Sequence, residues 1–181
     1  MVGRLGPPMI FLLLIVSLGF GWAVFNPSNQ SRSDETVLKN LSQFALNSKI
    51  PEGGKVKSSS GEELDLKSVI NSIKGPILLT FWSPDCAHCQ EGVKNLDQFP
   101  SEKWTNLLIA HRVRSFAVGQ LLTTYGVGLS SFVDEQGLLL LDWRSTMPGS
   151  FLIQEGDIRY FFPGRMDRKI LELLQSELAG Q

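Results

Sequence analysis

The chain contains two cysteines, Cys86 and Cys89, which lie three positions apart. A pair at this spacing either performs thiol chemistry or supplies half of a metal site. As a structural crosslink the pair would be poorly placed, because a loop of about four residues yields about 2 kcal/mol, against about 3 kcal/mol for a loop of about 15 residues. The spacing therefore favours a reaction over a stabilising role.

The cysteines follow a predicted strand and open a predicted helix. Residues 77–82 form a continuous apolar run of strand length, typical of a central parallel strand covered on both faces. After a short turn at 83–85, a helix is predicted over 86–99. Cys86 would lie in its first turn, where free backbone N–H groups and the helix dipole lower the pKa of a thiol. Cys89 would lie on the same helix face, one turn on.

This placement predicts thiol-disulfide exchange. A Cys86 thiolate can attack a substrate disulfide, or a substrate thiol can attack a Cys86–Cys89 bridge, and both reactions pass through a mixed disulfide. Cys89, shielded by the helix, would be the resolving thiol.

The remaining pattern predicts alternating strands and helices around a mixed central sheet, an α/β fold with helices on both faces. Residues 138–141 fit a strand or a helix equally well, and Asp134 and Glu135 are interpreted as solvated turn charges. The other predicted elements are a helix over 34–48, a hairpin over 55–66, a helix over 66–73, a strand over 107–110, a helix over 116–125, a hairpin formed by 150–153 and 158–162, and a helix over 166–178.

The amino-terminal segment predicts a transmembrane helix. Residues 9–25 are apolar apart from one serine and two glycines, and Arg4 is the only charged side chain before Arg32. A cleaved signal peptide is the competing interpretation, which the bulky residues near its end disfavour. The positive-inside tendency of Arg4 places the body outside the cytoplasm. The predicted organisation is an anchor or signal segment at 1–25, a linker and leading helix at 26–54, and a folded domain at 55–181.

Charge and motif content exclude several classes of partner and cofactor. Seventeen Lys and Arg face 18 Asp and Glu, so no positive excess is available for nucleic acid. We expect no cofactor, because no glycine-rich phosphate loop follows a strand and no C-x-x-C-H haem motif is present. A metal site built from Cys86, Cys89, His88 and His111 is disfavoured, since the sequence offers no second close ligand pair. His111 is interpreted as a surface residue at a strand end.

Two segments resemble a known family. Residues 81–89, Phe-Trp-Ser-Pro-Asp-Cys-Ala-His-Cys after an apolar strand, resemble the active-site signature of the thioredoxin fold. Residues 146–153, followed by 156–158, resemble the cis-proline segment of that fold and its terminal hairpin. The lead-in at 60–66 and the predicted anchor narrow the resemblance to the TlpA/ResA/CcmG-like group of membrane-anchored thiol-disulfide oxidoreductases. It covers roughly residues 55–178.

The resemblance implies the layout of the site. The Met147-Pro148 peptide would be cis and face the cysteines, so Met147 and Pro148 are candidate substrate-binding residues. Independently of the resemblance, Trp82 is interpreted as a packing residue at the rim of the site and is a third candidate for substrate binding. Asp85, if ionised, should oppose a Cys86 thiolate, whereas His88, if protonated, should favour it. The Ala87-His88 pair resembles that of strongly oxidising relatives. A pKa shift of about one unit nevertheless corresponds to only about 30 mV, and reducing and oxidising members differ by about 100–150 mV.

The resemblance also implies a cellular role. We expect a single-pass protein of the bacterial inner membrane whose catalytic domain faces the periplasm, exchanges disulfides with protein substrates and receives electrons from a membrane-embedded thiol reductase. Anchored relatives are mostly reductants in cytochrome c maturation or the maintenance of copper-site thiols, which favours reduction here. A DsbA-like oxidant remains an alternative, as does a copper or haem carrier without redox turnover.

Overall fold

The computed structural model describes residues 48–99 and 101–180. The predicted anchor, the linker and all but the last residue of the predicted helix over 34–48 lie outside the described residues. Among the described helices, none combines the length and the apolar character needed to cross a bilayer. The domain predicted from residue 55 onward is thus described almost completely.

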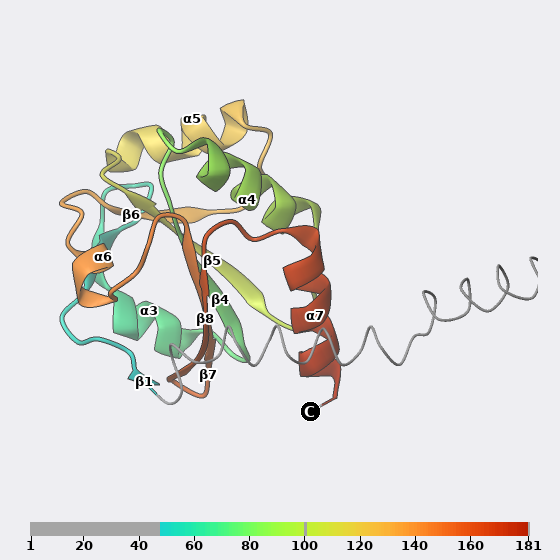
Figure 1. Cartoon of the computed structure of the whole chain (residues 1–181). Helices are drawn as coiled ribbons and strands as arrows, with labels where there is room; N and C mark the ends of the chain where they lie inside the picture. The colour runs from blue at the N-terminus through green and yellow to red at the C-terminus, as the bar shows by residue number, and fades with distance from the viewer. Residues whose placement is uncertain (1–47, 100, 181) are drawn as a thin grey trace, which may run out of the picture. The chain divides into compact units, whose positions relative to one another are not determined.

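Eight strands of the described chain form one mixed sheet in the order β1-β8-β7-β4-β5-β6-β2-β3 (Figure 1). β4 (Ile77–Trp82) lies at its centre, and all six of its residues are buried. It pairs in parallel with β5 (Thr105–His111) and antiparallel with β7 (Gly149–Gln154). The apolar run over 77–82 therefore predicts the position of the strand correctly, while only one of its two neighbours is parallel.

The other elements mostly match the sequence pattern, including both predicted hairpins. The remaining strands are β1 (Ser48–Lys49), β2 (Lys55–Lys57), β3 (Glu63–Asp65), β6 (Ser131–Asp134) and β8 (Asp157–Pro163). The helices are α3 (Leu66–Ser72), α4 (Ala87–Gln98), α5 (Ser115–Thr124), α6 (Leu139–Asp142) and α7 (Arg168–Ala179).

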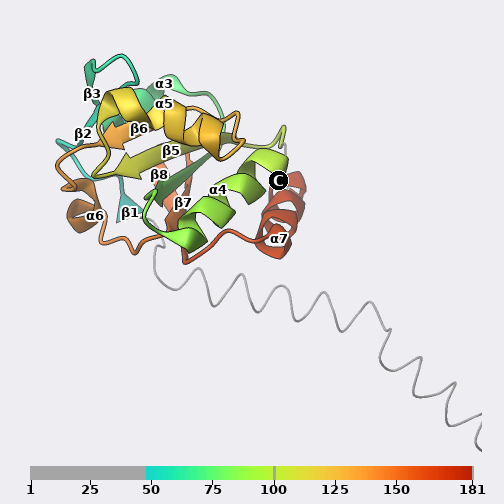
Figure 2. The same cartoon turned by 90° about the horizontal axis from the view of Figure 1, so that it is seen from above.

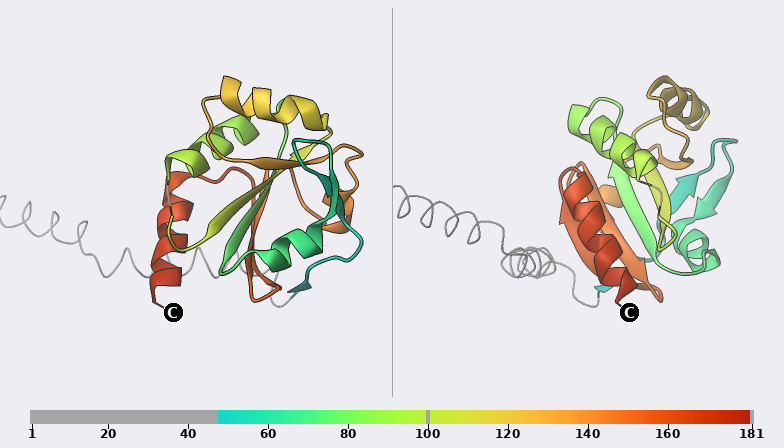
Figure 3. Two further views of the ribbon diagram at one scale, coloured as in Figure 1. Left: turned by 180° about the vertical axis from the view of Figure 1, so that it is seen from behind. Right: turned by 90° about the vertical axis from the view of Figure 1, so that its right-hand side faces the viewer.

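Helices cover both faces of the sheet, as the pattern predicts. The side chains of Leu79, Phe81 and Phe151 pack with residues of α3 and α6 in one core cluster. Because successive side chains of a strand point to opposite faces, Thr80 and Trp82 face the other side, where α4, α5 and α7 contribute buried residues. Figure 3 shows α4 and α7 on one side of the strands and α3 on the other.

Three local predictions are corrected or completed by the structure. Ser48, predicted as the end of a helix, instead pairs with Ile158 in the edge strand β1. Residues 138–141, which periodicity left open, are mainly helical, and Leu138 is the N-cap of α6. The pattern does not predict strand β6, because Ser131–Asp134 neither alternates nor forms a continuous apolar run; it pairs in parallel with β5 and completes the parallel half of the sheet.

Asp134, interpreted from the sequence as a solvated turn charge, is only 3 % exposed. Its carboxylate accepts hydrogen bonds from the backbone N–H groups of Gly137, Leu138 and Leu139 at 2.8, 3.2 and 2.9 Å. A buried carboxylate is tolerated where backbone donors satisfy it. Asp134 is therefore a structural residue that fixes the turn between β6 and α6.

Candidate redox site

The candidate site is built at the junction of β4 and α4. β4 ends at Trp82, and Pro84 and Asp85 carry the chain through a turn in which the Cys86 N–H donates to the Ser83 carbonyl at 3.3 Å. Cys86 is the N-cap of α4, and its carbonyl accepts from the N–H groups of Cys89 and Gln90 at 3.0 and 3.1 Å. The helix therefore begins directly behind the first sulfur, as the sequence predicts.

The two sulfurs differ in access. Cys86 and Cys89 form a disulfide whose Cα atoms are 5.2 Å apart. Cys86 is partly exposed, whereas Cys89 is 1 % exposed. The N–H of Cys89 also donates to the Cys86 sulfur at 3.2 Å. Because Cys89 is buried and Cys86 is not, an incoming thiol or disulfide would meet Cys86 first, and a charge that develops on its sulfur would meet a backbone donor and the positive end of α4.

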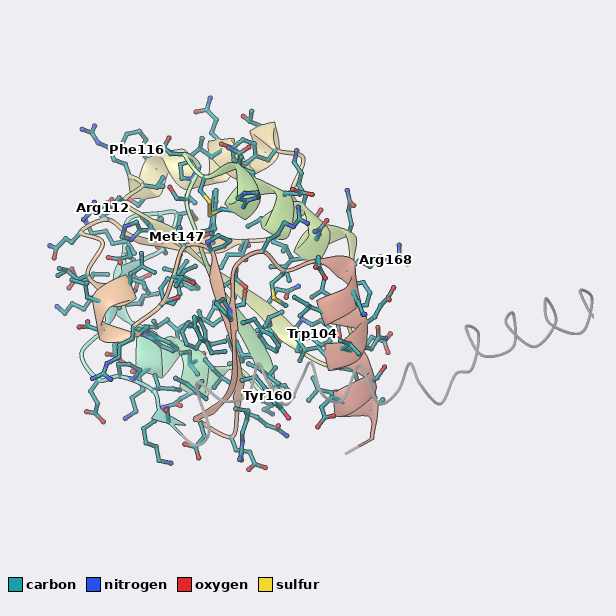
Figure 4. All side chains as sticks on the ribbon, viewed as in Figure 1. Trp104, Arg112, Phe116, Met147, Tyr160 and Arg168 are labelled. Carbon is teal, nitrogen blue, oxygen red and sulfur yellow. A yellow bond between two sulfur atoms is a disulfide. The ribbon has the colours of Figure 1, made fainter. Side chains whose placement is uncertain are left out.

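The segment before β7 lies beside this junction. The Met147-Pro148 peptide is cis. Phe81 pairs with Gly149. This pairing places Pro148 next to the carboxyl-terminal end of β4, where the turn at 83–86 begins. Figure 4 labels Met147 in this segment. The segment is packed tightly, because a Cβ on Gly149 would lie 2.7 Å from the Thr146 carbonyl oxygen.

The backbone of Pro148 is hydrogen-bonded within the described domain, whereas that of Met147 is not. The Pro148 carbonyl accepts from the Gly164 N–H at 2.9 Å and from the Thr146 hydroxyl at 3.1 Å. Within the described chain, the N–H and carbonyl of the partly exposed Met147 make no backbone hydrogen bond. Met147 therefore offers an unpaired backbone donor and acceptor close to the cysteines.

Asp85 and His88, the predicted pKa-tuning residues, flank the first sulfur in sequence and are exposed. Within the described residues, neither side chain has a hydrogen bond or an ion pair. Both side chains therefore face solvent, where a bound protein can contact them.

The prediction that Trp82 contacts the substrate is wrong. Its side chain is fully buried, its indole N–H donates to the Ser131 hydroxyl at 3.1 Å, and its ring meets the edge of Tyr125 at a centroid distance of 6.3 Å. A side chain without exposed surface cannot touch a protein substrate. Trp82 instead packs the sheet against α5 beneath the site.

The sequence pattern does not predict a buried pair of hydroxyl groups beneath the site. The hydroxyls of Thr80 and Ser150 lie 2.8 Å apart across β4 and β7, and the two residues are 3 % and 0 % exposed. They lie on the face of the sheet that α4 covers, by the alternation of side chains along β4. The available signal was the single threonine in the otherwise apolar run of residues 77–82.

His111 is less exposed than the sequence suggested. Its side chain is 15 % exposed, and its Nδ1 lies 3.8 Å from Oδ2 of Asp134 on the adjacent strand. Burial lowers the pKa of His111 below its usual value, against the opposing effect of Asp134. Across the described residues, no group of three or more His, Cys, Asp or Glu is arranged to hold a metal ion.

Comparison with known proteins supports the fold. No family model and no curated protein matches the chain. Among solved structures it is similar to a provisionally assigned thiol:disulfide interchange protein DsbE from Chlorobium tepidum, with 18% identity and a TM-score of 0.60 over 74% of this chain and 96% of that one.

Two further structures are similar over most of their length. One is a secreted Mycobacterium tuberculosis disulfide oxidoreductase homologous to E. coli DsbE, with 19% identity and a TM-score of 0.55 over 71% of this chain and 96% of that one. The other is StoA from Bacillus subtilis, with 21% identity and a TM-score of 0.55 over 73% of this chain and 99% of that one. The described domain therefore has a thioredoxin-like fold, and thiol-disulfide oxidoreductases are among its structural neighbours.

Proposed function

We propose that this chain is a thiol-disulfide oxidoreductase that acts on proteins, with Cys86 as the nucleophile and Cys89 as the resolving thiol. One observation carries the proposal: a reachable sulfur at the N-cap of α4 is bonded to a buried one, beside the cis Met147-Pro148 peptide. The names of the similar structures agree with this chemistry.

In the reducing direction, the Cys86 thiolate attacks one sulfur of a client disulfide. A mixed disulfide forms and one client thiolate leaves. The Cys89 thiol then loses its proton and attacks the Cys86 sulfur, so the mixed disulfide breaks, the second client thiolate leaves and the internal bridge forms. Two electrons pass from the dithiol to the client, and each released thiolate takes up a proton. The oxidising direction is the reverse.

The Met147 backbone supplies a means of holding the client. An extended client segment can pair with the free N–H and carbonyl of Met147, as a short added strand does at a sheet edge. Such pairing would hold the client disulfide near the partly exposed Cys86 sulfur.

The proposed setting is the periplasmic side of a bacterial inner membrane, with residues 1–25 as the anchor. The apolar run over 9–25 supports the anchor, and the name of one similar structure describes a secreted disulfide oxidoreductase. We further propose that the chain acts as a reductant, supplied by a membrane-embedded thiol reductase, in cytochrome c maturation or related thiol maintenance.

The central test is a trapping experiment. Cys89→Ala should accumulate a covalent, dithiothreitol-sensitive complex between Cys86 and a client protein, because nothing is left to resolve it. The matched control, Cys86→Ala/Cys89→Ala, should trap nothing. A metal-loaded species without any mixed disulfide would contradict the proposal and support the carrier alternative.

The equilibrium redox potential decides whether the chain acts as a reductant or an oxidant. The equilibrium potential of the Cys86–Cys89 pair against glutathione should lie near the roughly −270 mV of thioredoxin. A value near the roughly −120 mV of DsbA would overturn the reducing role and leave the exchange chemistry intact.

A further inference from the structure

Residues 164–167 join β8 to α7 and contact both the Met147-Pro148 segment and helix α4. We call them the β8–α7 connection. At its start, the Gly164 N–H donates to the Pro148 carbonyl at 2.9 Å. Gly164 has a φ of +89°, a conformation that favours glycine, and there the chain leaves β8. Figures 1 and 2 show the connection passing alongside α4 before α7 begins.

Three residues of α4 meet the next part of the connection. Arg165 Nη1 lies 2.5 Å from Glu91 Oε2, and Asn95 Nδ2 donates to the Met166 carbonyl at 3.0 Å. Gly92 faces the connection, because a Cβ there would be in ordinary van der Waals contact, 3.5 Å from both the Met166 nitrogen and the Arg165 Cγ. Met166 itself is 1 % exposed, so the connection is anchored in the core at this point.

These contacts add to the packing that holds α4 in place. The pairing of β4 with β7 fixes Pro148 relative to Trp82, and α4 packs in the core through its buried residues Cys89, Val93 and Leu96. That packing does not itself connect α4 to the Met147-Pro148 segment. The contacts of Glu91 and Asn95 lie beyond Cys89 and join the helix to the segment that also holds Pro148.

We propose that the β8–α7 connection is the positioning element of the redox site, with Arg165 and Asn95 as positioning residues. It keeps the Cys86 sulfur at a fixed spacing from Met147, so that a client bound to the Met147 backbone presents its disulfide to the sulfur. The inference rests on the proposed function and adds what selects protein disulfides over small ones. A small disulfide touches the sulfur alone and is indifferent to the spacing, whereas displacements of about 1 Å slow a positioned reaction strongly.

The test isolates the attack step in full-length chains that carry Cys89→Ala. With excess disulfide, the Cys86 thiolate forms a mixed disulfide and releases one thiolate, whatever the redox potential of the native pair. Two probes are compared by quenched flow and mass spectrometry: insulin, whose disulfides lie in a polypeptide, and 2-hydroxyethyl disulfide, which has no peptide backbone. The readout is the ratio of their rate constants, which cancels any change in the pKa of the Cys86 thiol.

Adding Asn95→Ala/Arg165→Ala should lower the insulin rate constant by about tenfold and leave the small-disulfide rate constant within about twofold. Adding Arg165→Glu alone should lower the ratio, and the charge swap Glu91→Arg/Arg165→Glu should restore it. The matched control is Arg168→Ala, which removes a surface ion pair to Glu172 on α7 at 2.9 Å and should leave the ratio unchanged.

An unchanged ratio in Asn95→Ala/Arg165→Ala overturns the inference, including the case in which both rate constants fall together because α4 has lost structure. A charge swap that fails to restore the ratio overturns the part assigned to Arg165. Failure of the proposed function is a separate result, because the unsubstituted chain would then catalyse no exchange with either probe.

Discussion

Two loops that follow the carboxyl-terminal ends of β4 and β6 differ in whether their acidic side chains are exposed or bonded. β4 and β6 both run parallel to β5, so the turn at 83–86 and the turn at 135–138 emerge on one side. In the first turn, the Asp85 side chain is exposed and, among the described residues, without a partner. Directly before the second turn, Asp134 at the end of β6 is buried against three backbone N–H groups.

Glu135, the next residue, is also fully engaged. It lies 2.7 Å from the Lys57 ammonium, and its other oxygen accepts from the Ser115 N–H at 2.9 Å, at the start of α5. Residue type alone therefore does not assign a carboxylate to chemistry or to structure. Both turns lead into a helix with free N–H groups at its start. At α4 the N–H of Cys89 bonds to Cys86, whereas at α6 the N–H groups of Leu138 and Leu139 bond to Asp134.

The sharpest difference between the turns should appear on removing Cys86. In Cys86→Ala, exchange with protein disulfides should fall at least about 10³-fold, because no other sulfur is reachable. The free energy of unfolding, measured by urea denaturation on reduced chains, should change by less than about 1 kcal/mol. Residual exchange above a few per cent would mean that Cys89 becomes reachable.

Substitution of Asp134, directly before the second turn, should lower stability and leave the exchange rate nearly unchanged. Asp134→Ala leaves the N–H groups of Leu138 and Leu139 without an acceptor and that of Gly137 with only the Asp134 carbonyl, at 3.3 Å, and should reduce the free energy of unfolding by about 3 kcal/mol. The rate of exchange per folded molecule should stay within about threefold of the parent. A matched Asp134→Asn variant should recover part of the stability, and a loss of rate at unchanged stability would instead assign Asp134 to the chemistry.

Asp85→Asn should have a smaller, purely electrostatic effect. Removing a negative charge next to Cys86 in sequence favours its thiolate, so the pKa of the Cys86 thiol should fall and exchange at pH 6 should speed up by about threefold. The pKa is measured from the thiolate absorbance near 240 nm in the Cys89→Ala background. Glu62→Gln, at an exposed residue on the β2–β3 turn, serves as the control and should not move it.

The smallest expected effect is a pH dependence of stability at Glu135. The hydrogen bonds and charge of Lys57, together with the hydrogen bond from Ser115, lower the pKa of Glu135 from 4.5 to about 2. Because the folded pKa lies below the unfolded one, the contribution is present above about pH 4.5 and is lost as the pH falls toward 2. Glu135→Gln should flatten that part of the stability profile in urea titrations, and an unaltered profile would contradict the assignment.

Much of the fold could be predicted from periodicity, because long apolar runs and amphipathic helices leave a clear pattern. Strand β4 and the hairpin of β7 and β8 have these patterns. Strands β1 and β6 do not, since β1 has only two residues and the four residues of β6 neither alternate nor form an apolar run. Their places in the sheet come from pairing with β8 and β5, which are distant in sequence.

The site shows the same division. The position of Cys86 and Cys89 at the start of a helix follows from a local motif, and the cis Met147-Pro148 peptide agrees with the family resemblance. The burial of Trp82 and the hydroxyl pair of Thr80 and Ser150 depend on which face of β4 is covered by which helix. The contact of Arg165 with Glu91 joins elements that only the folded chain brings together.

The unpaired backbone of Met147 has a consequence for the range of clients. Main-chain pairing reads the peptide unit that every polypeptide shares, so it tolerates almost any residue around the client cysteine. Under the proposed function, such a site would therefore accept many different clients. Selectivity, where it exists, must come from features outside the shared peptide unit, such as the accessibility of the client cysteine and confinement of both proteins to one compartment.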